Sequence, residues 1–150
     1  PLLVEKNYIH KDNFDRGYLV SLVKLFQPRL TTLNDFPEWA DFFFVEDVTV
    51  EPKAGEKHLN KDFSREFKLF INKLDGLNDF TIENIETAFR DLLKELNIES
   101  KALIHPVRVA LTGKTIGPGL FEVIFYLGKD RVKHRLNKFI TTGGKHGFKN

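Results

Sequence analysis

The 150-residue sequence predicts an all-α fold. Nearly every segment with regular hydrophobicity repeats its apolar residues every three or four positions, which places them on one face of a helix. The one strand-like alternation, over residues 48–50, is too short to support a sheet. A hydrophobic fraction of 41%, with 15 Phe, is typical of a folded protein with a buried core. We expect two small helical subdomains, residues 1–100 and 101–150.

The first long helix is expected to follow Phe14 and to stop before Pro28. A proline disfavours the helical conformation of the residue before it. We therefore expect Gln27 to leave helical geometry and a turn to carry Arg29. The broad apolar face of this helix consists of Tyr18, Leu19, Leu22, Val23, Leu25 and Phe26.

A short helix is expected next, with Thr32 or Asn34 as its cap and Pro37 in its first turn. The aromatic cluster that follows, Trp39 and residues 42–44, has two interpretations. Its rings could stack on exposed nucleobases. Such a cluster is more often the packing centre of a small helical domain, and we adopt this second interpretation.

The clearest amphipathic helix covers four turns after Thr81, whose hydroxyl is suited to cap its first turn. The apolar face of this helix repeats at helical spacing through Leu96. Glu86 and Arg90 stand four residues apart on the polar side, a spacing that allows an ion pair. The other helices expected in the middle of the chain cover residues 52–59 and 64–76.

The last third of the chain places a Gly/Pro loop between helices. A mostly apolar run, residues 102–111, is interrupted by Pro106. Three glycines and Pro118 mark a loop over residues 113–119, and a short apolar helix over residues 120–127 closes at the next glycine. A final helix is expected to bury Val132, Leu136, Phe139 and Ile140 and to expose Lys129, Arg131, Lys133, Arg135 and Lys138.

Charge is distributed unevenly along the chain, although the net charge is only +2. Residues 1–100 hold 13 Lys and Arg against 19 Asp and Glu, a net −6, and residues 101–150 hold 10 against 2, a net +8. A basic block of this kind is a usual way to present a face to a polyanion. A solvated basic helix would have the same composition, so charge alone leaves both interpretations open. The Gly- and Lys-rich tail, residues 141–150, is expected to be mobile.

No residue pattern in the chain points to catalysis, and none points to a metal site. Without cysteine there is neither a disulfide nor a thiolate ligand. The Gly113-Lys-Thr sequence resembles the end of a phosphate-binding loop, but the earlier glycine of that motif would fall at position 108, which is Arg. No apolar run is long enough to cross a bilayer. The five histidines, none at a metal-ligand spacing from another, are His10, His58, His105, His134 and His146.

The segment from Arg108 to Glu122 carries the strongest functional indication. It consists of a helix end, a rigid Gly/Pro turn and a second helix start. Exposed backbone groups of such a turn can hydrogen-bond a splayed-out base, while Leu120 packs against it and the Arg108 guanidinium stacks or forms paired hydrogen bonds. Alternatively, Gly113 only ends one helix and Pro118 only starts the next. That alternative does not account for the basic residues around the turn, so we favour RNA binding.

Two motifs, one in each half of the chain, can be compared with known families. The run from Pro106 to Val123, PVRVALTGKTIGPGLFEV, is followed by LGKDRV at Leu127. An earlier run, QPRLTTL at Gln27, precedes WADFFF at Trp39. In their order and spacing, these motifs resemble the C-terminal part of bacterial-type glutamyl-tRNA synthetases, a class I aminoacyl-tRNA synthetase family. The resemblance covers most of the chain, although residues 53–100 match in pattern more than in identity.

The resemblance implies an all-helical, cage-like anticodon-binding domain made of two subdomains. It implies that Arg29 reads the third anticodon base, and that the Gly/Pro loop contacts the first, with Arg108 beside it. Some relatives have Thr where this chain has Gly117, so recognition at that position is expected through the main chain. The expected loop contacts are Gly117, Pro118, Gly119 and Leu120, and the expected phosphate contacts are Lys114, Arg131 and Arg135.

The family's ATP-binding motifs are absent from this sequence. The resemblance therefore implies that ATP, Mg²⁺ and the ligation of glutamate to tRNA(Glu) belong to an N-terminal catalytic domain of the parent enzyme. It further implies a cytoplasmic, monomeric protein. Two other classes are considered: a helical protein-interaction module with a basic helix, and a DNA-binding helix-turn-helix protein. The second is disfavoured because the loop over residues 113–119 is longer than the turn of that motif.

Overall fold

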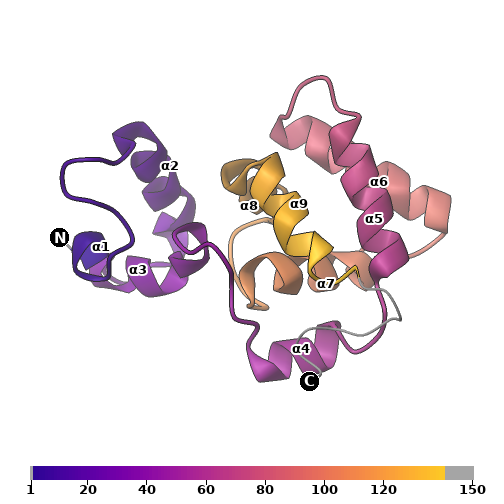
Figure 1. Cartoon of the computed structure of the whole chain (residues 1–150), viewed down its shortest axis with the longest axis horizontal. Coiled ribbons are helices and arrows are strands. Elements are labelled where there is room, and N and C mark those ends of the chain that lie inside the picture. Colours follow the sequence, from indigo (N-terminus) through magenta and orange to yellow (C-terminus); the bar gives the residue numbers. More distant parts are fainter. Residues whose placement is uncertain (1, 141–150) are drawn as a thin grey trace. The chain divides into compact units, whose positions relative to one another are not determined.

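A computed structural model describes residues 2–140 of the chain. Regular structure within this range is helical, apart from an isolated bridge between His10 and Asn13, so the predicted all-α class is confirmed (Figure 1). The basic tail after Ile140 lies outside the described residues. No helix among residues 2–140 is long and apolar enough to span a membrane.

The chain forms two compact units, which meet in sequence between Asp47 and Val48. Unit 1 precedes this point and unit 2 follows it. The sequence pattern placed the division near residue 100 instead. The difference has a simple cause: α6 (Ile82–Leu96) packs against α8 (Leu120–Leu127), so helices on both sides of residue 100 share one core. Hydrophobic periodicity identifies each helix but not the helix against which it packs.

Unit 1 is organised around α2 (Arg16–Phe26), where the first long helix was expected. Asp15 caps it by accepting a hydrogen bond from the Tyr18 backbone N–H at 3.0 Å. The α-helix ends before Pro28, but Gln27 keeps helical angles of φ −48° and ψ −43°, so the prediction for Gln27 is wrong. The chain tightens into a 3₁₀ turn that accepts Pro28 near its start. The other elements of unit 1 are α1 (Leu2–Glu5), η1 (Gln27–Arg29), η2 (Leu33–Asp35), α3 (Phe36–Trp39) and η3 (Asp41–Phe43).

The core of unit 1 is aromatic, as expected. The Phe26 ring lies 5.8 Å from Phe36 and 5.9 Å from Phe43 between ring centroids, both in edge-to-face geometry. Phe42 and Phe43 are buried and form the packing centre, whereas Trp39 and Phe44 are half-buried beside it. Thr32 forms a capping box with Asp35 at the start of η2. The helix with Pro37 in its first turn, α3, is preceded by Asp35, so neither Thr32 nor Asn34 caps it as expected.

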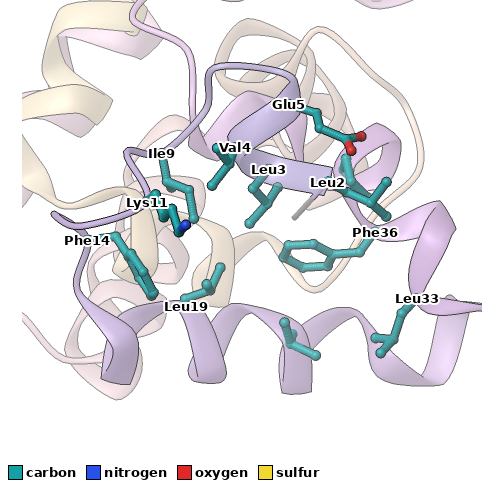
Figure 2. A pocket seen from close by; sticks show the side chains of 12 residues that line it. Leu2, Leu3, Val4, Glu5, Ile9, Lys11, Phe14, Leu19, Leu33 and Phe36 are labelled. Atoms are coloured by element: carbon teal, nitrogen blue, oxygen red, sulfur yellow. The ribbon is translucent and has the colours of Figure 1, made fainter.

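Unit 1 also has an apolar pocket of about 760 Å³ beside α1, α2 and α3 (Figure 2). Leu33 and Phe14 at this pocket are 68% and 42% exposed, whereas Phe36 is buried. Glu5 and Lys11 are the charged residues that line it. Nothing among its lining residues provides a nucleophile paired with a base.

Unit 2 contains the remaining helices. Within it, α5 (Ser64–Asp75) packs on α6 and α9 (Lys129–Asn137), and α6 packs on α8. The helix α7 (Lys101–Thr112) packs on α4 (Pro52–His58) and α9. Pro106 lies inside α7, which continues past it as one helix. The proline removes the N–H that would bond to the carbonyl of Ala102, and Ala102 is exposed, where water can take that place.

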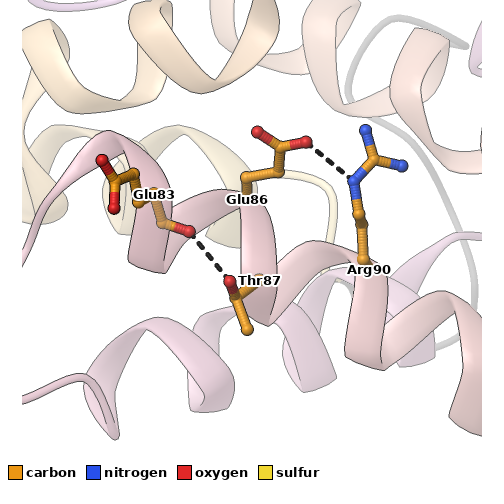
Figure 3. Close-up of polar contacts among 4 residues, drawn as sticks. All are labelled: Glu83, Glu86, Thr87 and Arg90. Carbon is orange, nitrogen blue, oxygen red and sulfur yellow. Dashed lines mark hydrogen bonds and ion pairs between the residues drawn. The ribbon is translucent and has the colours of Figure 1, made fainter.

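The predicted amphipathic helix is confirmed in α6. Thr81 accepts a hydrogen bond from the Asn84 backbone N–H at 3.1 Å, and Asn97 ends the helix in the left-handed conformation. Glu86 and Arg90 form the expected ion pair at 2.8 Å (Figure 3). Both side chains are largely exposed, so this pair contributes only about 0.3–0.5 kcal/mol. The buried side chains of α6 are Ile85, Ala88, Phe89, Leu92 and Leu93.

Candidate nucleic-acid interface

The loop between α7 and α8, residues 113–119, begins at a sharp and well-supported turn. Gly113 has φ +77°, in the left-handed region, and its N–H donates to the Val109 carbonyl at 2.8 Å. The buried Thr112 hydroxyl donates to the Arg108 carbonyl at 2.8 Å and accepts from the Lys114 backbone N–H at 3.0 Å. The first residues of the loop are therefore fixed by bonds within the chain.

The far side of the loop is held by Arg108. Its Nη1 donates to the carbonyl oxygen of Pro118 at 2.7 Å, across ten residues of sequence. A Cβ atom added at Gly117 would lie 3.4 Å from the same nitrogen. The structure thus brings Arg108, Gly117 and Pro118 together, as the sequence predicted. It also shows that the guanidinium supports the loop backbone from the side of α7.

The apolar side chain that the loop exposes is Ile116 and not Leu120, as had been expected. Leu120 is 3% exposed, because it starts α8 on the face that packs into unit 2. This position contradicts the expectation that the Leu120 side chain packs against a base. Ile116 is 66% exposed and was missed by the sequence analysis. Its signal was an aliphatic residue inside a polar, glycine-flanked loop.

Arg135 occupies a different position from the one predicted for a phosphate contact. The side chain is 1% exposed, and its Nη1 donates to the Leu111 carbonyl at 2.7 Å. Leu111 lies in the last turn of α7, where carbonyl oxygens lack helical partners and attract a cation. Arg135 therefore supports the end of the helix that leads into the loop. The expectation that it lies on the exposed side of α9 is wrong.

The other basic residues of this region are less buried. Lys114 is half-buried at the start of the loop. Arg131 is also half-buried, and its Nε donates to the Leu127 carbonyl at 2.8 Å. On α9, Lys133 pairs with Asp75 of α5 at 3.0 Å and Lys129 lies 3.8 Å from the same carboxylate. Part of the positive charge of α9 is thus balanced within unit 2.

Arg29 is exposed at the end of η1 in unit 1. The loop over residues 113–119 belongs to unit 2. The role of Arg29 in reading a base remains a prediction.

Two histidines meet in unit 2, outside the loop. The rings of His58 on α4 and His105 on α7 lie 4.8 Å apart between centroids. Burial lowers the pKa of His58, and the neighbouring His105 and Lys57 lower it further. His105 is half-buried on α7.

The described residues do not fit ATP with Mg²⁺. Within residues 2–140, no three His, Asp or Glu side chains come together as a metal-binding group. The turn at Gly113 lacks the earlier glycine that a phosphate-binding loop needs. No catalytic step is therefore assigned to this chain.

Comparison with known proteins agrees with these features. The family model described as "Anticodon binding domain" matches residues 2–140. The glutamate–tRNA ligase of Syntrophobacter fumaroxidans is 38% identical over 120 residues, which cover 80% of this chain and 26% of that protein. Glutamate–tRNA ligase 2 of Thermoanaerobacter pseudethanolicus is 35% identical over 144 residues, covering 93% of this chain and 29% of that protein. The chain thus spans less than a third of the length of these relatives.

A solved structure shares the fold. The glutamate tRNA ligase of Elizabethkingia meningosepticum, crystallised in complex with its amino acid, superposes with a TM-score of 0.79 at 22% sequence identity. The match covers 93% of this chain and 28% of that one.

Proposed function

This chain belongs to the anticodon binding domain family, and we propose that it reads the anticodon of a tRNA by direct contact with its bases. The observation that carries the proposal is the loop over residues 113–119, which is braced at both ends and lies in the most basic part of the chain. A loop already held in one conformation loses little entropy when a base binds to it.

The loop offers a base both backbone and apolar contacts. The Pro118 carbonyl is already engaged by Arg108, and proline has no N–H. Gly117 and Gly119 therefore supply the main-chain groups that hydrogen-bond a base edge, while the exposed Ile116 side chain covers one face of the base. Leu120 contributes indirectly, because its buried side chain fixes the start of α8.

Arg29 is the second proposed reader. Its exposed guanidinium presents several donors in one plane, which suits paired hydrogen bonds to a single base. Lys114 and Arg131 are proposed to attract the phosphate backbone, a contribution that is insensitive to sequence and weakens with salt. Arg135, predicted as a third phosphate contact, is assigned instead to the support of α7.

The proposed partner is the anticodon stem-loop of tRNA(Glu), because the relatives reported above are glutamate–tRNA ligases. The chain would then be the tRNA-selecting part of a longer, cytoplasmic and monomeric enzyme. ATP, Mg²⁺ and the joining of glutamate to tRNA belong in this proposal to a catalytic domain on the same polypeptide.

Binding of labelled stem-loops, followed by fluorescence anisotropy, tests the proposal. We compare the tRNA(Glu) anticodon stem-loop with variants that carry one changed anticodon base, at several salt concentrations. A lost base contact should weaken binding by roughly 5- to 100-fold, as is typical for paired hydrogen bonds to a base. Equal affinity for all stem-loops and for duplex DNA would overturn the proposal. Binding to an acidic protein but not to RNA would favour a protein-interaction module.

A further inference from the structure

We propose that the backbone of residues 49–51 is a positioning element for the loop over residues 113–119. The inference rests on the proposed function for the identity of what the loop recognises. The contacts between residues 49–51 and the loop do not depend on that function. Residues 48–50 were the one strand-like stretch of the sequence, and they form no sheet in the structure. They run instead past the first residue of the loop (Figure 1).

Two contacts fix this arrangement. The Glu51 backbone N–H donates to the Gly113 carbonyl at 2.9 Å. A Cβ atom at Gly113 would overlap the Thr49 carbonyl oxygen and lie 3.1 Å from its carbonyl carbon. Glycine is therefore required at position 113 for two reasons: the positive φ and the close approach of another backbone segment.

Both backbone polar groups of Gly113 are consequently engaged. Its N–H bonds within α7, and its carbonyl oxygen bonds to Glu51, the residue that precedes Pro52 at the start of α4. Residues 49–51 thus lead into α4, and the hydrogen bond from Glu51 connects them to Gly113 at the end of α7. The two helices also pack on each other, with His58 and His105 in contact. The hydrogen bond between Glu51 and Gly113 therefore joins two helices that are already packed together.

This attachment should matter for specificity more than for general affinity. The orientation of Gly113 sets the direction in which the loop leaves α7. A loop that departs in several directions still lies near the phosphates, but it no longer aligns its backbone groups with one base. We therefore assign the Glu51 N–H and Gly113 as positioning groups for base discrimination.

Substitution of Glu51 by proline removes the donor and places the ring Cδ where the N–H points, so the Gly113 carbonyl oxygen can no longer approach Glu51. Glu51 has φ −61° and ψ 132°, which suits a proline ring and a position before Pro52. Its side chain is exposed, so Glu51→Ala is the matched control that keeps the N–H. We expect Glu51→Pro to reduce the matched-to-mismatched affinity ratio about 2- to 10-fold, the range for one lost hydrogen bond. Glu51→Ala should keep the wild-type ratio.

Two further readouts separate positioning from general destabilisation. The salt dependence of binding should be the same in both variants, because no phosphate contact is removed. Without RNA, hydrogen exchange at residues 114–119 should speed up in Glu51→Pro and not in Glu51→Ala. Unchanged loop exchange together with an unchanged affinity ratio in Glu51→Pro would overturn the inference.

The wild type provides a test that does not depend on any variant folding. The Glu51 amide should be protected from exchange and should show scalar coupling through the hydrogen bond to the Gly113 carbonyl carbon. An amide that exchanges at the rate of an unstructured peptide would overturn the inference. If the loop amides respond to Glu51→Pro while the wild type does not discriminate between anticodons, the positioning geometry stands and the proposed function fails.

Discussion

Replacement of Arg135 by methionine separates its two competing roles. The structure makes this guanidinium a buried partner of the Leu111 carbonyl, at 2.7 Å, whereas the charge pattern suggested a phosphate contact. Methionine retains much of the apolar stem but removes the donor. The buried Leu111 carbonyl oxygen then loses this hydrogen bond.

The expected cost follows from this geometry. A hydrogen bond from a charged donor contributes about 1.5–3 kcal/mol when the acceptor has no alternative partner. At about 3 °C per kcal/mol for a chain of this size, the midpoint of thermal unfolding should fall by roughly 5–10 °C. Lys68→Met, at an exposed position within α5, is the matched control and should change stability by less than about 0.5 kcal/mol.

Calorimetry and RNA titrations on the same two variants decide between the roles. Arg135→Met should lower the unfolding midpoint but keep the slope of log affinity against log salt, measured below the unfolding transition. A phosphate contact would instead reduce that slope by about one unit and leave the midpoint near the wild-type value. The second outcome would refute the assignment of Arg135 to the end of α7.

Three other substitutions test separate parts of the account. Ile116→Ser should weaken binding of the matched stem-loop roughly 5- to 30-fold by loss of about 1–2 kcal/mol of apolar burial against a base, whereas Val20→Ser, at another exposed apolar position, should not. Equal effects would exclude a specific role for Ile116. Arg29→Gln should relax discrimination at one anticodon base roughly 5- to 100-fold without changing the unfolding midpoint, and unchanged discrimination by anisotropy would contradict it. Because burial, His105 and Lys57 lower the pKa of His58 below its unfolded value near 6.5, the contribution of neutral His58 to stability is present above that pH and is lost as pH falls through the folded pKa. His58→Gln should therefore flatten the fall in unfolding midpoint between about pH 7 and 5, and an unaltered pH profile would contradict this cause.

Local signals in the sequence predicted the helices well. Thr81 as a cap and Gly128 as a terminator lie where the structure begins α6 and ends α8. These features depend on hydrogen bonds within a few residues, which short patterns encode. The division of the chain into units depends on which helices pack together, and no pattern around residue 100 encodes the contact of α6 with α8.

The two errors at the candidate site have a common cause. Arg135 falls at helical spacing with Val132 and Phe139, and Leu120 with Val123 and Leu127, so both positions are compatible with the buried faces that the structure shows. Positive charge and family resemblance suggested exposed roles for them instead. The only sequence signal for the exposure of Ile116 was its position as an aliphatic residue in a polar, glycine-flanked loop.

Chemical-shift mapping of the 150-residue chain with the tRNA(Glu) anticodon stem-loop tests base readout most directly. The amides of residues 114–119 and of Arg29 should shift with the matched stem-loop, and those of the loop should shift less when the contacted base is changed. Undisturbed amides at residues 113–119, under conditions where the stem-loop binds, would contradict anticodon recognition by this loop.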